Sequence, residues 1–283
     1  MTILLRTNTD GWNQEGVGSI CQWNILLNAL SKELSVEFCA DPFSNLNHYQ
    51  YNGFTSEAWS ALFTDFFNFK KIDINNPVVN YDGSLEELVT LGKTTNDTVV
   101  INVSKQFIVN NCFSRISEFG QKGYFSNIRK NLTFNDEYYF DEEYLNISLH
   151  LRSTNPGDIP PDCPAMETFG VWLGEEKICG LIDQLKKKYY NRKTRFYIHS
   201  QGNVEKFSMI QNQSTENFEV ILKLNEIPTK DLYHMSFADV LILARSSYSW
   251  MAHLLNDNLT LARDNFHQPL KHGVILLNSN YNF

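Results

Sequence analysis

Three serines follow a short apolar segment in the second half of the chain, in a pattern that could bind an anion. Residues 239–244 (DVLILA) are typical of a buried strand, and the apolar residues of 250–255 recur at helical spacing. Ser246, Ser247 and Ser249 lie where this strand would turn into the helix. Such a turn leaves backbone N–H groups unpaired beside the positive end of the helix dipole. The stretch therefore indicates a phosphate site, with an ordinary N-cap at Ser246 or Ser247 as the alternative.

Polar residues also follow three other predicted strands. Ligands of open parallel α/β sheets bind at the carboxyl ends of the strands, and three of these four strand ends belong to one half of the chain. We therefore expect those three to converge on one sheet edge, where an arginine, hydroxyl groups and a helix N-terminus could bind a diphosphate. The residues at the three further strand ends are Gly18 and Ser19, then His150 and Arg152, then Ser200, Gln201 and Gly202.

Predicted strands and helices alternate along the chain, which favours an α/β protein with parallel sheets in two successive units. The apolar residues of 20–34 recur every three or four positions, as expected for one face of a helix. Residues 135–143 are acidic, and we interpret them as the approach to a domain boundary. The other predicted elements are strands at 2–6, 36–40, 98–103, 144–151, 195–199 and 219–223, and helices at 56–69, 107–119, 124–131, 175–189, 202–211 and 232–237.

The composition excludes several functional classes. The 283 residues carry a net charge of −8, which disfavours non-specific binding to nucleic acid. No apolar run approaches the ~20 residues of a membrane span. The five cysteines show neither a C-x-x-C pair nor zinc-ligand spacing. We therefore expect a soluble, cytoplasmic protein with reduced thiols that binds no nucleic acid and does not span a membrane.

Several of these stretches resemble the three signature regions of fucosyltransferase-like glycosyltransferases. They are residues 16–19 with Gln22, residues 150–152 with Gly157 and Asp158, and residues 246–249. Residues 197–202, 238–241 and 246–250 are also similar to exostosin-like glycosyltransferases and to those of algae and their large viruses, such as chlorovirus xylosyltransferases. A viral origin would place the protein in the host cytoplasm. The resemblance is strongest over residues 145–270.

The resemblance implies a GT-B-like fold, in which two Rossmann-like domains with parallel sheets face a central cleft. Residues 1–140 would form the acceptor-side domain, residues 141–270 the nucleotide-sugar-binding domain, and residues 271–283 a tail that packs back on the first domain. In the family pattern a second arginine closely follows the first, whereas here Ser153 follows Arg152 and an acidic residue arrives only at Asp158. This departure weakens the case for GDP-fucose and favours a UDP-sugar such as UDP-xylose.

Carried over by position, the resemblance assigns a role to each polar strand end. Arg152 would hold the diphosphate and His150 the ribose or a phosphate, with an interdomain salt bridge and a core histidine as the alternatives. Gly18 and Ser19 would approach the donor from the first domain. The alternative is that Gly16 and Gly18 form an ordinary turn. Phosphate oxygens would be bound by Ser246, Ser247 and Ser249, and the base or ribose pocket would be lined by Ser200, Gln201 and Gly202.

The chain has no Asp-x-Asp motif of the kind that binds the metal in the other major glycosyltransferase fold. We therefore expect no cofactor and no obligatory metal, with the leaving-group charge neutralised by Arg152 and a helix N-terminus. An inverting transfer needs a general base on the acceptor hydroxyl. His48 and Asp73 are candidates, as are Asp10 and Asp41, and each could also be a cap or turn residue.

Together these features predict a metal-independent, inverting glycosyltransferase. It would move a sugar from a nucleoside-diphosphate donor to a hydroxyl of an oligosaccharide or glycan acceptor. A GDP-fucose-dependent fucosyltransferase is one alternative, and a non-catalytic nucleotide- or glycan-binding module with the same fold is another. The G-x-S-x-G motif of an α/β hydrolase is absent.

Overall fold

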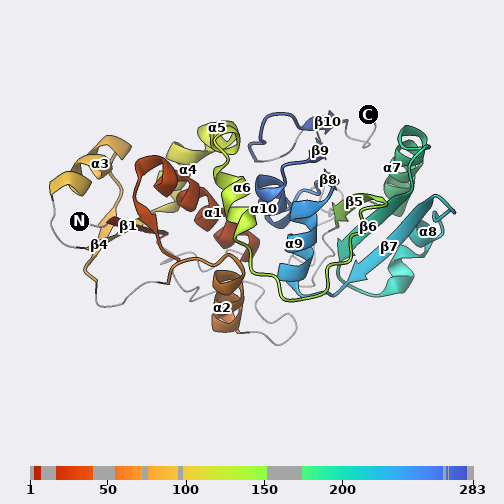
Figure 1. The fold of residues 1–283 in the computed structure, drawn as a ribbon, viewed down its shortest axis with the longest axis horizontal. Helices are drawn as coiled ribbons and strands as arrows, with labels where there is room; N and C mark the ends of the chain where they lie inside the picture. The colour runs from red at the N-terminus through yellow and green to blue at the C-terminus, as the bar shows by residue number, and fades with distance from the viewer. Residues whose placement is uncertain are drawn as a thin grey trace, which may run out of the picture. The chain divides into compact units, whose positions relative to one another are not determined.

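The computed structural model describes residues 3–7, 17–40, 55–71, 76–94, 98–151, 174–263, 266 and 268–278. The chain divides into two compact units, Met1–Thr133 and Phe134–Phe283. Each unit is built around one parallel sheet with helices packed along it (Figure 1). The predicted α/β class with two parallel sheets is therefore confirmed. The division falls a few residues before the predicted boundary between 140 and 141.

A four-stranded sheet organises the first unit. All neighbouring strands are parallel, with Leu5 opposite Ile101 and Asn80 opposite Asn102. The strand order is β2-β1-β4-β3, and β3 is missing from the predicted elements because it is a short edge strand with exposed side chains. The strands are β1 (Ile3–Thr7), β2 (Glu37–Phe38), β3 (Val78–Tyr81) and β4 (Val99–Val103).

Apolar spacing predicted the helices of the first unit except the one at Leu85–Thr94, and one predicted helix is interrupted. In the first helix Ile20, Trp23 and Leu27 are buried, as predicted. The predicted helix over 107–119 is interrupted at Arg115, where the backbone has φ −108° and ψ 5°. Apolar spacing continues across this break, so periodicity does not reveal it. The helices are α1 (Val17–Leu34), α2 (Ser56–Phe66), α3 (Leu85–Thr94), α4 (Lys105–Cys112), the 3₁₀ helix η2 (Phe113–Arg115), α5 (Ile116–Gln121) and α6 (Tyr124–Lys130).

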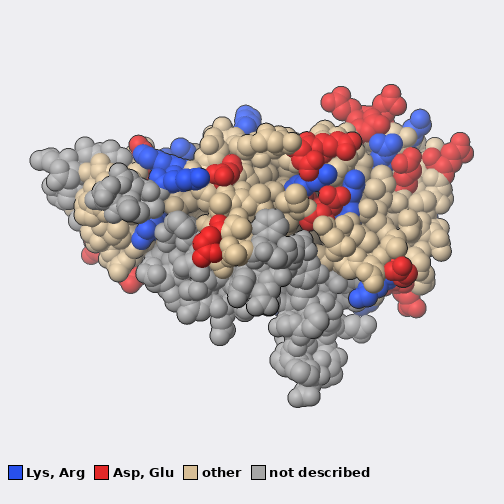
Figure 2. Space-filling view, turned by 90° about the horizontal axis from the view of Figure 1, so that it is seen from below, with Lys and Arg blue, Asp and Glu red and all other residues tan. Residues whose placement is uncertain are grey.

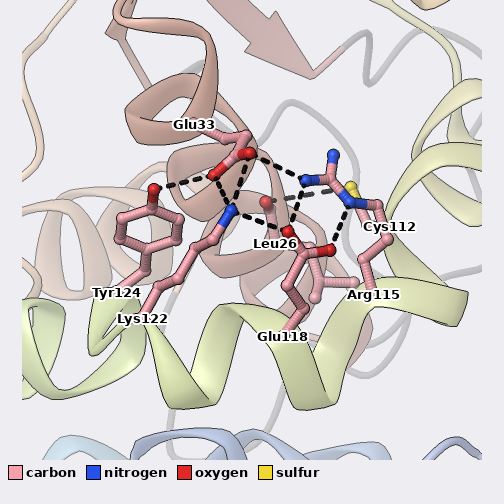
Figure 3. Close-up of polar contacts among 7 residues, drawn as sticks. All are labelled: Leu26, Glu33, Cys112, Arg115, Glu118, Lys122 and Tyr124. Carbon is pink, nitrogen blue, oxygen red and sulfur yellow. Dashed lines mark hydrogen bonds and ion pairs between the residues drawn. The ribbon is translucent and has the colours of Figure 1, made fainter.

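A surface ion network fastens α1 to the helices that follow α4 (Figure 3). Glu33 of α1 accepts hydrogen bonds from Lys122 Nζ and from the Tyr124 hydroxyl, both at 2.8 Å. Lys122 Nζ also donates to Glu118 at 2.7 Å, and Arg115 lies 2.9 Å from Glu118 and 3.1 Å from Glu33. Hydrogen bonds from Arg115 and Lys122 lower the pKa of Glu118 to about 2.

A six-stranded, all-parallel sheet organises the second unit, in the order β10-β9-β8-β5-β6-β7. The chain adds β6 and β7 on one side of β5 and then returns to add β8, β9 and β10 on the other side. Residues 271–283, predicted as a tail against the first domain, contribute β10, which pairs with β9 of this sheet. The strands are β5 (Leu145–His150), β6 (Thr194–Ser200), β7 (Phe218–Leu224), β8 (Val240–Ile242), β9 (Leu259–Arg263) and β10 (Ile275–Leu277).

The two faces of the second sheet differ in polarity. Ile147, Leu149 and Phe196 belong to an apolar core that also includes buried residues of α7. Successive side chains of a strand point to opposite faces, so Ser148 and His199 lie on the other face, with α9. The helices of this unit are α7 (Glu175–Lys188), the 3₁₀ helix η3 (Val204–Phe207), α8 (Ser208–Gln211), α9 (Pro228–Phe237) and α10 (Ser247–Leu255).

The segment that opens the second unit lies along α9. Phe134 stacks on Tyr233 and Tyr139 stacks on His234, with ring centroids 4.0 Å and 3.4 Å apart. His234 Nε2 accepts a hydrogen bond from the Tyr139 N–H at 3.2 Å, and its Nδ1 donates to the Lys230 carbonyl at 2.8 Å. These two bonds fit the neutral ring, and burial lowers the pKa of His234 to about 3.

Candidate functional site

The strand order of the second sheet reverses between β5 and β8. In open parallel sheets, ligands bind at the carboxyl edge where such a reversal occurs, because the two outgoing loops turn to opposite faces. His150 ends β5, and Ser246 and Ser247 follow β8. Tyr248 lies next to His150, with their ring centroids 5.1 Å apart. Residues from both sides of the reversal thus meet at this edge.

The predicted turn from strand to helix after β8 is present. Ser246 is the N-cap of α10, and its Oγ accepts a hydrogen bond from the Tyr248 N–H at 3.2 Å. Ser249 is fully buried, and its Oγ donates to the carbonyl oxygens of Ala244 at 2.7 Å and Ser246 at 3.0 Å. Ser247, half-buried, is the first residue of α10. The capping role of Ser246 is the alternative that the sequence left open, and Ser249 stabilises the same turn.

The start of α9 lies at the same edge. The Tyr248 hydroxyl donates a hydrogen bond to the carbonyl oxygen of Pro228, the first residue of α9. The first turns of α9 and α10 are therefore adjacent, and each helix carries the positive end of its dipole at its start. This arrangement favours negative charge near the carboxyl ends of β5 and β8.

The ends of β6 and β7 are joined by hydrogen bonds beyond their last paired residues. Ser200 Oγ donates to the Leu151 carbonyl at 2.8 Å, and the Ser200 carbonyl accepts from the Asn225 N–H at 3.0 Å. The Asn225 side chain bonds both the N–H and the carbonyl of Gly202, each at 3.0 Å. Half-buried Gln201 lies between these contacts. Sequence reasoning missed Asn225, although asparagine is among the few residues that adopt its left-handed conformation readily.

A buried polar array lies next to this edge, on the face of the sheet that carries α9. His199 Nδ1 is 2.7 Å from Asp231 Oδ1, and His199 Nε2 is 3.3 Å from Ser148 Oγ. Burial raises the pKa of Asp231, and the His199 partner opposes that rise. A hydroxyl, an imidazole and a carboxylate in this order occur in nucleophilic catalysts. Here Ser148 and His199 are both 0% exposed, so the array holds α9 to the sheet.

Several predicted site residues lie outside the described residues or in the first unit. Arg152, His48 and Asp73 are outside the described residues, as are Asp10 and Asp41. Gly18 and Ser19 lie in the first turn of α1, where Gly18 is buried and Ser19 is half-buried. The structure therefore brings together His150, Ser200, Gln201, Gly202, Ser246, Ser247 and Ser249 at one edge of the second sheet.

The described part of the chain holds no recognisable metal site. No three of its His, Cys, Asp and Glu residues are grouped so that they could hold a metal ion. Cys21, Cys39, Cys112 and Cys179 are free thiols, and burial raises the pKa of Cys112 to about 12. On the face drawn in Figure 2, several Lys and Arg side chains adjoin one another at the left, and Lys and Arg are mixed with Asp and Glu at the right. None of the helices within the described ranges has the length and apolar character of a membrane span.

Comparisons with known proteins find similarity at the level of structure. No protein-family model and no curated protein matches the sequence significantly. The glycosyl transferase family 9 structure from Veillonella parvula has 11% identity and a TM-score of 0.47, covering 98% of this chain and 87% of that chain. E. coli heptosyltransferase WaaC with ADP has 10% identity and a TM-score of 0.46, covering 99% and 95%. POFUT1 in complex with GDP has 11% identity and a TM-score of 0.42, covering 97% of both chains. Likeness at this level identifies neither a donor nor an acceptor.

Proposed function

We propose that the protein is a glycosyltransferase that binds a nucleoside-diphosphate sugar at the carboxyl edge of its second sheet. The observation that carries the proposal is the meeting of His150 with Tyr248, at the start of α10, where the strand order reverses. The sequence resemblance of residues 150–152 and 246–249 to glycosyltransferase signature regions supports it independently.

In this proposal the diphosphate lies at the start of α10, where backbone N–H groups and the helix dipole favour an anion. His150 and Arg152 contact the diphosphate or the ribose, and Ser246 and Ser247 contribute backbone N–H and hydroxyl groups. Ser249 supports the turn from within, because its hydroxyl already donates to two carbonyl oxygens. The charge that develops on the leaving diphosphate is then neutralised without an obligatory metal.

The nucleoside lies toward β6, where Ser200, Gln201 and Gly202 line its pocket. In the transfer step, the acceptor oxygen forms a bond to the anomeric carbon while the bond from that carbon to the diphosphate breaks. The acceptor proton passes to a general base, for which His48 and Asp73 are the candidates. This inverting route leaves a nucleoside diphosphate and an extended glycan.

A UDP-sugar such as UDP-xylose is the donor we favour, because Ser153 follows Arg152 and the second arginine of the fucosyltransferase pattern is absent. GDP-fucose is the alternative donor. Calorimetric titration with UDP, GDP, ADP and CMP, with and without EDTA, separates these possibilities. We expect UDP to bind most tightly, with an affinity that EDTA does not change. Tightest binding of GDP would select the fucosyl donor, and loss of binding in EDTA would overturn the metal-independent part.

Arg152→Ala tests the diphosphate contact directly. Loss of a charge-assisted, bidentate contact should weaken binding of the preferred nucleotide about tenfold or more. Arg192→Ala is the matched control, because Arg192 is exposed near the amino end of β6, at the opposite edge of the same sheet. Equal affinities of the Arg152 variant and the control would show that the diphosphate site is misplaced. Nucleotide binding without sugar transfer to any glycan acceptor would favour the non-catalytic module.

A further inference from the structure

We infer that Asn225 is a positioning residue that holds the nucleoside end of the bound nucleotide in place through Gly202. The inference rests on the proposed function, because it concerns the pocket that Ser200, Gln201 and Gly202 form in that proposal. It adds the residue that directly follows β7, a strand to which no ligand contact has been assigned.

The Asn225 carboxamide extends the pairing of β6 with β7 beyond the end of both strands. The last paired residues are Ser200 and Leu224. Beyond them, the Asn225 N–H donates to the Ser200 carbonyl. The Asn225 side chain forms hydrogen bonds with both the backbone N–H and the backbone carbonyl of Gly202. The carboxamide thus replaces a peptide group of a neighbouring strand, accepting through Oδ1 and donating through Nδ2.

Both partners have backbone conformations that make this pairing possible. Asn225 has φ 58° and Gly202 has φ 114°, so both lie in the region that L side chains rarely adopt. The left-handed turn at Asn225 brings its short side chain back toward β6. Gly202 alone would sample many conformations, and the two hydrogen bonds select one of them. Gln201 is held between fixed neighbours as a result.

Asn225 and Gly202 lie at the part of the sheet edge where the proposal places the nucleoside, away from the proposed diphosphate site. In the sheet, β5 separates β6 from β8, and neighbouring strands are about 4.8 Å apart. The end of β6, which Gly202 follows, therefore lies about two strand spacings, or roughly 10 Å, from the end of β8, which leads into α10. A ribose and base that extend from a diphosphate at α10 would reach this part of the edge.

The test compares a nucleoside diphosphate with inorganic pyrophosphate in the full-length protein. Asn225→Gly keeps the left-handed conformation accessible but removes the carboxamide, so we expect about a threefold to tenfold loss of affinity for UDP or GDP. Affinity for pyrophosphate should stay unchanged, because its site is at α10. Asn225→Asp keeps the acceptor for the Gly202 N–H but places a carboxylate oxygen against the Gly202 carbonyl, so its nucleotide affinity should also fall below that of the wild type.

Asn68→Gly is the matched control, because Asn68 is an exposed asparagine with φ 51° in the first unit. It should leave both affinities unchanged. An unchanged nucleotide affinity in Asn225→Gly, or an equal loss for nucleotide and pyrophosphate, would overturn the positioning role. If the wild-type protein binds pyrophosphate but no nucleoside diphosphate, the proposed function fails as well, and the two failures are thereby distinguished.

Discussion

The surface ion network of the first unit and the buried polar array of the second unit differ in their exposure to solvent. The ion network joins five side chains of α1, η2, α5 and α6 and their connections, and all of them reach solvent. The buried polar array joins only Ser148, His199 and Asp231, of which Asp231 is the most exposed at 8%. The buried polar array has fewer members, but the stability of its unit should depend more on each of them.

The reason is the cost of leaving a polar group unpaired. In the surface ion network, water and salt ions replace a lost partner, so each pair contributes little to stability. In the buried polar array no water replaces Asp231, and the His199 ring would keep a donor without an acceptor. Burial, and not the number of contacts, therefore decides how much each cluster contributes to the free energy of unfolding.

Removal of the Asp231 side chain should cause the largest loss in free energy of unfolding in this comparison. Asp231→Ala leaves the buried His199 ring with a donor that has no acceptor and should lower the free energy of unfolding by about 1–3 kcal/mol. Asp231→Asn keeps an oxygen that can accept from Nδ1 and should lower it less. Urea denaturation measures both, with Asp183→Ala, an exposed acid on α7, as the control. A loss in Asp231→Ala no larger than in the control would contradict the distinction between the two clusters.

Acid should destabilise the second unit because of His234. The loss in free energy of unfolding should be smaller than that caused by Asp231→Ala and larger than that caused by disrupting the surface ion network. As pH falls below about 6.5, the unfolded chain takes up a proton at this residue. In the folded chain His234 stays neutral until about pH 3. The free energy of unfolding therefore falls as the pH is lowered through this window. Denaturation at several pH values between about 7 and 5 should show the decrease, and His234→Gln should flatten it. An unchanged slope in the variant would mean that other groups, such as buried His253, account for the acid sensitivity.

Disruption of the surface ion network should cause the smallest loss of stability. Glu33→Gln removes the charge that Lys122 and Arg115 share, and we expect a slight decrease in Tm at low salt. About 1 M NaCl should abolish the difference from wild type, because it shortens the Debye length to about 3 Å. A decrease that persists at high salt, or that equals the decrease in Asp231→Ala, would show that exposure does not separate the clusters.

Local sequence patterns predicted the elements that bury a regular apolar face. The spacing of Ile20, Trp23 and Leu27 predicted α1, and the apolar run at 239–244 predicted β8. β3 has exposed side chains and offers no such pattern. β9 and β10 were also missed.

The candidate site was only partly predictable for a different reason. His150 lies at the end of one predicted strand and Ser246 follows another, so the rule for parallel sheets predicted that both lie at one edge. Asp231 was not foreseen, because it meets His199 from 32 positions away along the chain and only through the packing of α9 on β6. Asn225 depends on a left-handed backbone that its residue type permits but does not require.

The placement of β8 beside β5 also has a consequence for how the protein folds. The Asn146 N–H donates to Asp239 Oδ2 at 2.8 Å across 93 positions of the sequence. Pairing over such a separation closes a long loop and is slow, whereas β6 can join β7 sooner. We expect the proposed site at the carboxyl ends of β5 and β8 to be assembled late, so a partly folded chain would bind no nucleotide. Nucleotide present during refolding would then stabilise only molecules whose sheet is complete.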